Sequence, residues 1–318
     1  LNRRPYVVGI VLLLAAAVLW SLNGALIKLI HEEGRGPHGV TIAFYRSLFA
    51  GLFLLPLARG RFHTLQKKSS DRKTQKTSPA TPLSLFAIRH SLFSLRPAAI
   101  SCVIFFTLMT VCFVLANIKT KAANAIILQY TSTFWVFGLS PWMLREKPRM
   151  GDIWILGLAM IGIVIIFVGN AATDLFGLVI ALGAGLFFGL LTLMIRQMRD
   201  SDSAAVTVLN NLGSALLLLP AALLVGGLMV STRAWILLIV MGVVQFGLPY
   251  YLYTLGLVRV PAYQAALLTL IEPVLVPVWT YLAVREKVPL MTVVGGGVIL
   301  LALLLFLRAA SIQRKAKR

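Results

Sequence analysis

Long apolar stretches alternate with short polar segments along almost the whole chain. A helix needs about 20 apolar residues to cross the hydrocarbon core of a bilayer. The pattern therefore predicts an all-α membrane protein with ten transmembrane helices. They are expected at residues 6–30, 39–58, 98–118, 122–143, 150–169, 175–195, 203–226, 233–255, 262–283 and 289–308.

One interval between the predicted spans is much longer than the others. Residues 59–97 are rich in Lys, Ser and Thr and contain the run KKSSDRKTQKTSPATP. This composition predicts a disordered or surface-lying loop. The second half, SLFAIRHSLFSLRP, mixes apolar and basic residues, so it suits either a short helix on anionic lipid or an unstructured linker.

The distribution of Lys and Arg predicts which side of the membrane each segment faces. Of the 318 residues 59% are apolar, and the net charge of +20 comes from basic residues between the apolar spans. If the N-terminus lies inside, the inner segments carry 22 Lys and Arg residues and the outer segments carry seven. The positive-inside rule then places both termini and the 59–97 loop in the cytoplasm. The same distribution argues against nucleic acid as a partner.

Two parts of the chain resemble each other. The triplet REK at 145–147 aligns with REK at 285–287, and this offset of 140 matches three spans. A second offset, 168, pairs Trp20 with Phe188 at the start of each half. These matches predict two five-helix units, residues 1–169 and 170–318. Because five is odd, the second unit must enter the membrane from the opposite side, which gives two inverted repeats.

Glu272 lies near the middle of the ninth predicted span, followed directly by Pro273 and one turn later by Pro277. A carboxylate at that depth costs about 2.5–3.5 kcal/mol even on the lenient insertion scale. Proline also removes a backbone donor and leaves carbonyl groups without partners. Glu272 is therefore the first functional candidate, and the alternative is a structural bond to another helix.

Arg46 lies near the middle of the second span, where an unpaired guanidinium is equally costly. An offset of 164, which pairs Pro56 with Pro220, makes the neutral Asn210 its counterpart in the second repeat. Two interpretations stay open: an ion pair with Glu272, or a fork that binds a carboxylate or phosphate of a substrate.

Several other polar and aromatic residues within the spans predict a polar, aromatic cavity. These candidates are Trp20, Asn23, Gln129, Tyr130, Gln245, Tyr250 and Tyr253. For each one alone, the alternative is an interhelical hydrogen bond worth about 0.6 kcal/mol. The small residues of Gly185-x-x-x-Gly189 and the glycine run at 295–297 predict close helix packing instead of binding.

The arrangement of spans and four motifs resembles the EamA-type family of the drug/metabolite transporter superfamily. The motifs are Trp20–Ser21 with Lys28 after them, FYRSLFAG around Arg46, LQYTS at 128–132, and LIEPVLVPVWTYLAVRE at 270–286. The resemblance covers both repeats. It implies secondary transport, commonly export, of small metabolites such as amino acids or of toxic organic compounds. It also implies a bacterial inner membrane and a central cavity between the halves.

The chain departs from the family pattern in two ways. Ser132–Thr133 stand where the repeat would place a second Glu–Pro, and family members often have a proline there. This puts the symmetry of the hinge in doubt. The 59–97 loop is also unusually long.

The sequence predicts a secondary transporter that exports a small metabolite by alternating access. No motif for hydrolysis, nucleotide binding or metal binding is present, so an enzyme, a cofactor and a metal are not expected. Energy would come from exchange or from an ion gradient, with Glu272 as the candidate carrier of a coupling proton. The partners are then the small-molecule substrate and the lipid bilayer. The alternatives are a gradient-independent facilitator or exchanger, and a scaffold or sensor acting through the 59–97 loop.

Overall fold

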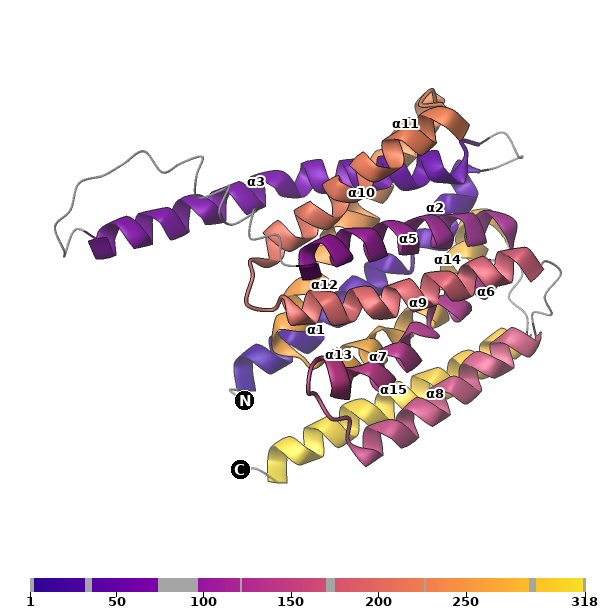
Figure 1. Cartoon of the computed structure of the whole chain (residues 1–318). Helices are drawn as coiled ribbons and strands as arrows, with labels where there is room; N and C mark the ends of the chain where they lie inside the picture. Colours follow the sequence, from indigo (N-terminus) through magenta and orange to yellow (C-terminus); the bar gives the residue numbers. More distant parts are fainter. Residues whose placement is uncertain are drawn as a thin grey trace.

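The computed structural model describes residues 3–31, 36–73, 97–120, 122–169, 175–225, 227–285 and 290–316. These residues form helices and no strands (Figure 1). The helices of the first half are α1 (Arg3–Trp20), α2 (Asn23–Ile30), α3 (Gly39–Lys73), α5 (Pro97–Lys119), α6 (Ala122–Gln129), α7 (Ser132–Met143) and α8 (Met150–Gly169). Those of the second half are α9 (Leu175–Gln197), α10 (Ser203–Val225), α11 (Thr232–Val240), the π-helix η2 (Met241–Gly247), α12 (Leu248–Arg259), α13 (Ala262–Leu268), the 3₁₀ turn η3 (Thr269–Ile271), α14 (Glu272–Val284) and α15 (Leu290–Ala316).

The helix positions agree with the predicted spans, but three spans are interrupted. The first span is divided into α1 and α2, and the fourth into α6 and α7. The ninth is divided into α13 and α14 by η3. Each interruption lies near the middle of its span, so backbone groups that a continuous helix would pair are free to bind side chains.

The helices identify a multi-pass membrane protein. Among the described residues, seven helical stretches are long and apolar enough to cross a membrane, and Met150–Ile165 and Val293–Ala309 are shorter apolar helices. Large apolar side chains lie on the outer surface, including Trp154 at 77% exposure and Leu224 at 85%. Such exposure is costly in water but expected against lipid.

The prediction of a loop from residue 59 was wrong at its start. Helix α3 continues to Lys73 and projects from the bundle at the end where both termini lie (Figure 1). The segment after Ala58 contains Leu, Arg, Gln and Lys, which favour helix, and it has no proline before Pro79. A helix already formed at 39–58 can therefore continue. The predicted interfacial segment at 84–97 lies outside the described residues except for Pro97.

Glycines allow the central helices to approach closely. A Cβ atom at Gly185 would lie 2.7 Å from the carbonyl oxygen of Leu128, and one at Gly189 would lie 3.0 Å from that of Ser132. Helix α9 therefore packs directly on the interruption between α6 and α7. The packing prediction is confirmed for this glycine pair.

The glycine run at 295–297 packs closely only in part. A Cβ atom at Gly162 would lie 2.7 Å from the carbonyl oxygen of Gly295, which brings α8 close to α15. Gly297, by contrast, has no described atom within 4 Å of a Cβ position. Gly295 thus serves the close approach that was predicted, and Gly297 does not.

Candidate functional site

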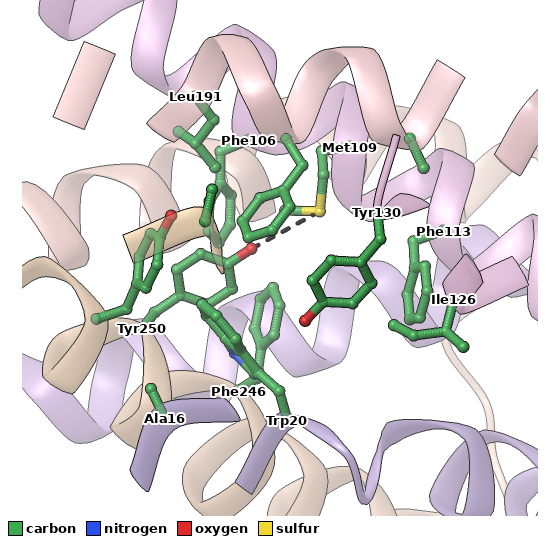
Figure 2. Packing of buried hydrophobic residues seen from close by; sticks show 14 of the residues in the cluster. Ala16, Trp20, Phe106, Met109, Phe113, Ile126, Tyr130, Leu191, Phe246 and Tyr250 are labelled. Atoms are coloured by element: carbon green, nitrogen blue, oxygen red, sulfur yellow. Dashed lines mark hydrogen bonds between the residues drawn. The ribbon is translucent and has the colours of Figure 1, made fainter. Parts of the chain in front are cut away.

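A small buried pocket lies at the centre of the bundle, beside the interruptions in the helices. It is lined by Trp20, Asn23, Arg46, Met109, Phe113, Gln129, Phe188, Phe246, Tyr250 and Glu272. Figure 2 shows the aromatic part of this wall, with Trp20, Phe246 and Tyr250 turned toward one another and Tyr130 beside them. The lining comes from both halves of the chain.

Glu272 is the first residue of α14 and is only 5% exposed. Pro273 follows it, and the turn before it is the 3₁₀ turn η3. The hydroxyl of Tyr130 lies 2.7 Å from Glu272 Oε2 and 2.6 Å from the carbonyl oxygen of Thr269. Both acceptors belong to the interruption between α13 and α14. Tyr130, at the other interruption, thus connects the two broken spans.

The break between α6 and α7 forms without a proline. The hydroxyl of Thr131 donates to the carbonyl oxygen of Leu128 at 2.6 Å, and the backbone N–H of Thr131 donates to the same oxygen at 3.2 Å. Gly185 of α9 packs against the same turn. Sequence comparison of the repeats put the symmetry of the hinge in doubt, yet breaks occur at matching positions of both spans.

Arg46 is buried, with 1% of its surface exposed. Its Nη1 donates to Asn23 Oδ1 at 3.4 Å, and its Cζ lies 4.1 Å from the centroid of the Phe246 ring. Its Nε has no hydrogen-bond partner. In the part of the chain that the structure describes, no ion pair joins Arg46 to Glu272, although both line the pocket. A cation–π contact and one long hydrogen bond leave the guanidinium with unused donor capacity.

Aromatic rings form one wall of the pocket. The ring of Trp20 lies 4.8 Å from that of Tyr250 and 4.9 Å from that of Tyr253, measured between centroids. Tyr250 also packs on Phe246 at 4.9 Å, and its hydroxyl points to the Met109 sulfur at 3.7 Å (Figure 2). The Nε1 donor of Trp20 is buried without a partner. Such a wall suits the flat or apolar part of a ligand.

The structure brings most of the predicted site residues together. Those in the lining are Trp20, Asn23, Arg46, Gln129, Tyr250 and Glu272. Tyr130 and Tyr253 lie behind it, in contact with Glu272 and with Trp20 respectively. Gln245 is fully buried away from the pocket and donates to the carbonyl oxygen of Trp20 at 3.2 Å.

Gln245 lies within the π-helix η2. A π-helical turn is wider than an α-helical turn, so residues across it do not keep the spacing of an α-helical stripe. From this part of the chain Phe246 and Tyr250 line the pocket, and Gln245 does not.

Sequence reasoning missed Met109, Phe113, Phe188 and Phe246. Phe188 had a signal, because the repeat alignment pairs it with Trp20. Met109 and Phe113 had none, since α5 is apolar over most of its length and its pattern does not single out one face. The lining therefore includes α5 and α9 as well as the predicted spans.

The pocket is nearly closed in this conformation. Its volume is about 20 Å³. A water molecule needs about 10–15 Å³ on this measure. Metabolite sites are typically several hundred Å³ in volume, so a metabolite needs a wider pocket than this one.

Comparison with known proteins gives a consistent result. The sequence model of the EamA-like transporter family matches residues 7–168 and 175–308. An uncharacterized transporter of Archaeoglobus fulgidus is 28% identical over 202 residues, which are 63% of this chain and 73% of that protein. A protein known from its crystal structure superposes with a TM-score of 0.71 over the full length of both chains, at 14% identity. That last similarity concerns the fold alone.

Proposed function

The chain belongs to the EamA-like transporter family, and from this premise we propose that it is a secondary transporter that exports a small organic metabolite by alternating access. The substrate carries a carboxylate or another compact anion together with an apolar or aromatic part, as amino acids and related compounds do. The central pocket is its binding site. Arg46 and Glu272 are the charged residues of that site.

One observation carries the proposal: two buried residues of opposite charge line one pocket without forming an ion pair. An unpaired charge in a low-dielectric interior is costly, so it is kept where a ligand or a proton supplies the missing partner. Arg46 Nε and Trp20 Nε1 are buried donors without acceptors. They can bind a carboxylate, while Glu272 can bind an ammonium group or a proton.

Three features support the two inverted five-helix repeats. First, the helix pairs match under a twofold axis that exchanges the repeats. The corresponding helices α3 and α10 pack on each other, as do α8 and α15. The pair of α5 with α9 is matched by the pair of α12 with α1. Second, the α6–α7 and α13–α14 breaks lie 140 residues apart. Third, Arg145 and Arg285, also 140 apart, share the same left-handed backbone with φ of 55°.

The interruptions at the pocket suggest how alternating access operates. Broken helices at the middle of the membrane can bend where their hydrogen-bond ladder is already open. The nearly closed pocket then corresponds to an occluded conformation, and it widens toward one side at a time. Because a nucleotide-binding segment is not apparent in the sequence, a proton or substrate exchange drives the cycle.

The decisive test uses the purified protein and reconstituted vesicles. Metabolites are screened by the rise in melting temperature, because a ligand that binds only the folded state stabilises it. We expect carboxylated ligands to raise the melting temperature of the wild type and of Asn210→Ala, and to leave Arg46→Gln unchanged. Asn210 is the repeat counterpart of Arg46 and lies outside the lining, so it is the matched control.

Transport of the same ligands in vesicles separates the alternative functions. A secondary transporter accumulates the ligand against its concentration gradient when a proton gradient or a counter-substrate is supplied. A facilitator only equilibrates it. If no ligand moves and none stabilises the protein, the proposal is wrong and a scaffold or sensor becomes the better interpretation.

A further inference from the structure

The acidic residue of the first REK triplet, Glu146, has no part in the pocket, yet both oxygens of its carboxylate make polar contacts with other helices. Glu146 Oε1 accepts from Arg196 Nε at 2.7 Å, and its Oε2 accepts from the backbone N–H of Ala262 at 2.9 Å. The side chains of Glu146 and Arg196 are only 12% and 9% exposed. Arg196 also donates to the carbonyl oxygen of Leu257.

These bonds join elements from both halves of the chain at one end of the bundle. Glu146 follows α7, Arg196 lies in the last turn of α9, Leu257 lies in the last turns of α12, and Ala262 begins α13. Nearby, the hydroxyl of Tyr6 in α1 donates to Gln264 Oε1 at 2.6 Å. This is the end where the N-terminus lies (Figure 1), which the charge pattern predicts to face the cytoplasm.

The contact closes the route from this end to the pocket. On α9, Phe188, Thr192 and Arg196 are four residues apart and therefore share one face. Phe188 lines the pocket, and the Thr192 hydroxyl lies 2.8 Å from that of Tyr253 on α12. The bond between Arg196 and the Leu257 carbonyl forms the last layer. The space between α9 and α12 is thus occupied, layer by layer, from the pocket outward.

Glu146 also touches the half-helix that leads to Glu272. Ala262 is the first residue of α13, which ends at Leu268 and is followed by η3 and then Glu272. A short helix of this kind moves as one piece, so release of its first residue frees its other end as well. Contact at the end of the bundle and conformation at the pocket are therefore mechanically linked.

We propose that Glu146 and Arg196 form the gate that closes the pocket at the end of the bundle where the N-terminus lies. This rests on the proposed alternating access, since a gate is required only if the pocket opens to that side. When the gate opens, both charged groups lie near water and can be hydrated, so the ion pair can break and reform in each cycle. At mid-membrane such a separation would leave two unsolvated charges.

Accessibility of the pocket to a water-soluble thiol reagent tests the gate. The reporter is Met109→Cys, in the pocket lining, in a background that has Cys102→Ala and Cys112→Ala. A second reporter, Ala316→Cys, lies at the end of α15 and identifies vesicles in which this end of the bundle faces the reagent. In those vesicles we expect Glu146→Gln and Arg196→Gln each to speed modification of the pocket cysteine at least fivefold.

Arg199→Gln is the matched control. Arg199 belongs to the same charge cluster, but its Nη1 is 3.7 Å from Glu146 and its side chain is 49% exposed. We expect its rate of modification to equal that of the parent. If either gate variant melts before the assay temperature, Glu146→Asp replaces it, because a shorter carboxylate cannot hold both Arg196 and the Ala262 N–H.

The outcomes separate the gate from the transport function. Unchanged modification in folded gate variants overturns the gate, even if the parent protein transports. Faster modification in both variants supports the gate, and it does so without any substrate. Failure of the parent to transport any ligand would contradict the proposed function alone. Equal acceleration by Arg199→Gln would overturn the assignment, because it would reflect general loss of charge.

Discussion

Tyr130 has one hydroxyl proton and two acceptors within reach, Glu272 Oε2 at 2.7 Å and the Thr269 carbonyl oxygen at 2.6 Å. A tyrosine hydroxyl can donate to only one of them at a time. If the carboxylate is ionised, it takes the hydrogen bond. If it is protonated, it can donate to the tyrosine oxygen, and Tyr130 can then donate to Thr269. A proton on Glu272 would thus change the bonding of the broken helix.

Glu272→Gln is the first variant to examine at this scale. The amide imitates the protonated acid, so we expect folding and substrate exchange to persist and gradient-driven accumulation to disappear. Uptake in vesicles with and without a proton gradient, beside the melting temperature, measures this. Accumulation restored in the double variant Arg46→Gln with Glu272→Gln would contradict the role of Glu272 in proton coupling. A structural pairing of Arg46 with Glu272 would then explain the loss of accumulation in Glu272→Gln.

Tyr130→Phe removes the hydroxyl and leaves Glu272 Oε2 without this donor, whereas the Thr269 carbonyl oxygen still accepts from the backbone N–H of Glu272. A buried group left unsatisfied costs about 1–3 kcal/mol. We expect the free energy of unfolding in detergent to fall by about that amount, and coupling to weaken more than binding. Tyr281→Phe is the control, because that side chain is 44% exposed on the outer surface. An equal loss in both variants would refute a special role for the Tyr130 hydroxyl.

At the scale of elements, the interruptions and the glycines beside them determine the site. The breaks put Asn23, Gln129 and Glu272 at or beside helix ends within the membrane, where free backbone groups and side chains meet. Helix α9 must come very close to support the α6–α7 break, and Gly185 makes this possible. A pocket at this place therefore depends on a residue that does not line it.

Gly185→Ala tests this dependence. The new methyl group would meet the Thr131 hydroxyl and the Leu128 carbonyl, and overpacking of this kind costs about 1–3 kcal/mol. We expect a lower melting temperature and weaker ligand binding. Gly157→Ala is the matched control on α8, where a Cβ atom would meet nothing within 4 Å. There the melting temperature should stay level or rise, because alanine favours helix more than glycine does.

At the scale of the whole molecule, the two termini lie at the same end of the bundle, and α3 projects from that end (Figure 1). An even number of crossings requires the termini to share a side. The excess of basic residues in the segments at this end predicts that the shared side is the cytoplasm. The proposed gate of Glu146 and Arg196 would then face inward.

Single cysteines at Ser70 and Ala316 test the orientation, in a background without Cys102 and Cys112. We expect both to resist a membrane-impermeant thiol reagent added outside intact cells and to react after the cells are opened. Labelling of either cysteine in intact cells would show that the predicted topology is wrong. The predicted arrangement of two inverted repeats would then also be contradicted.

The sequence by itself determined the positions of the spans and the residues that had to be explained within them. Arg46 and Glu272 stand out because a charge in a long apolar run is costly wherever the chain folds. Trp20, Asn23, Gln129 and Tyr250 could be named in advance because each places a polar group in a long apolar run. Transfer of a residue from water to hydrocarbon is a local property, so a local pattern reports it.

Only the tertiary structure decided what each residue faces. It left Arg46 and Glu272 without a mutual ion pair, buried Gln245 away from the pocket, and brought Met109 and Phe113 to the pocket from an almost uniformly apolar helix. These outcomes depend on contacts between helices that are far apart in the chain. A single sequence does not contain such contacts as a pattern, because packing partners are chosen by shape and by hydrogen bonds across interfaces.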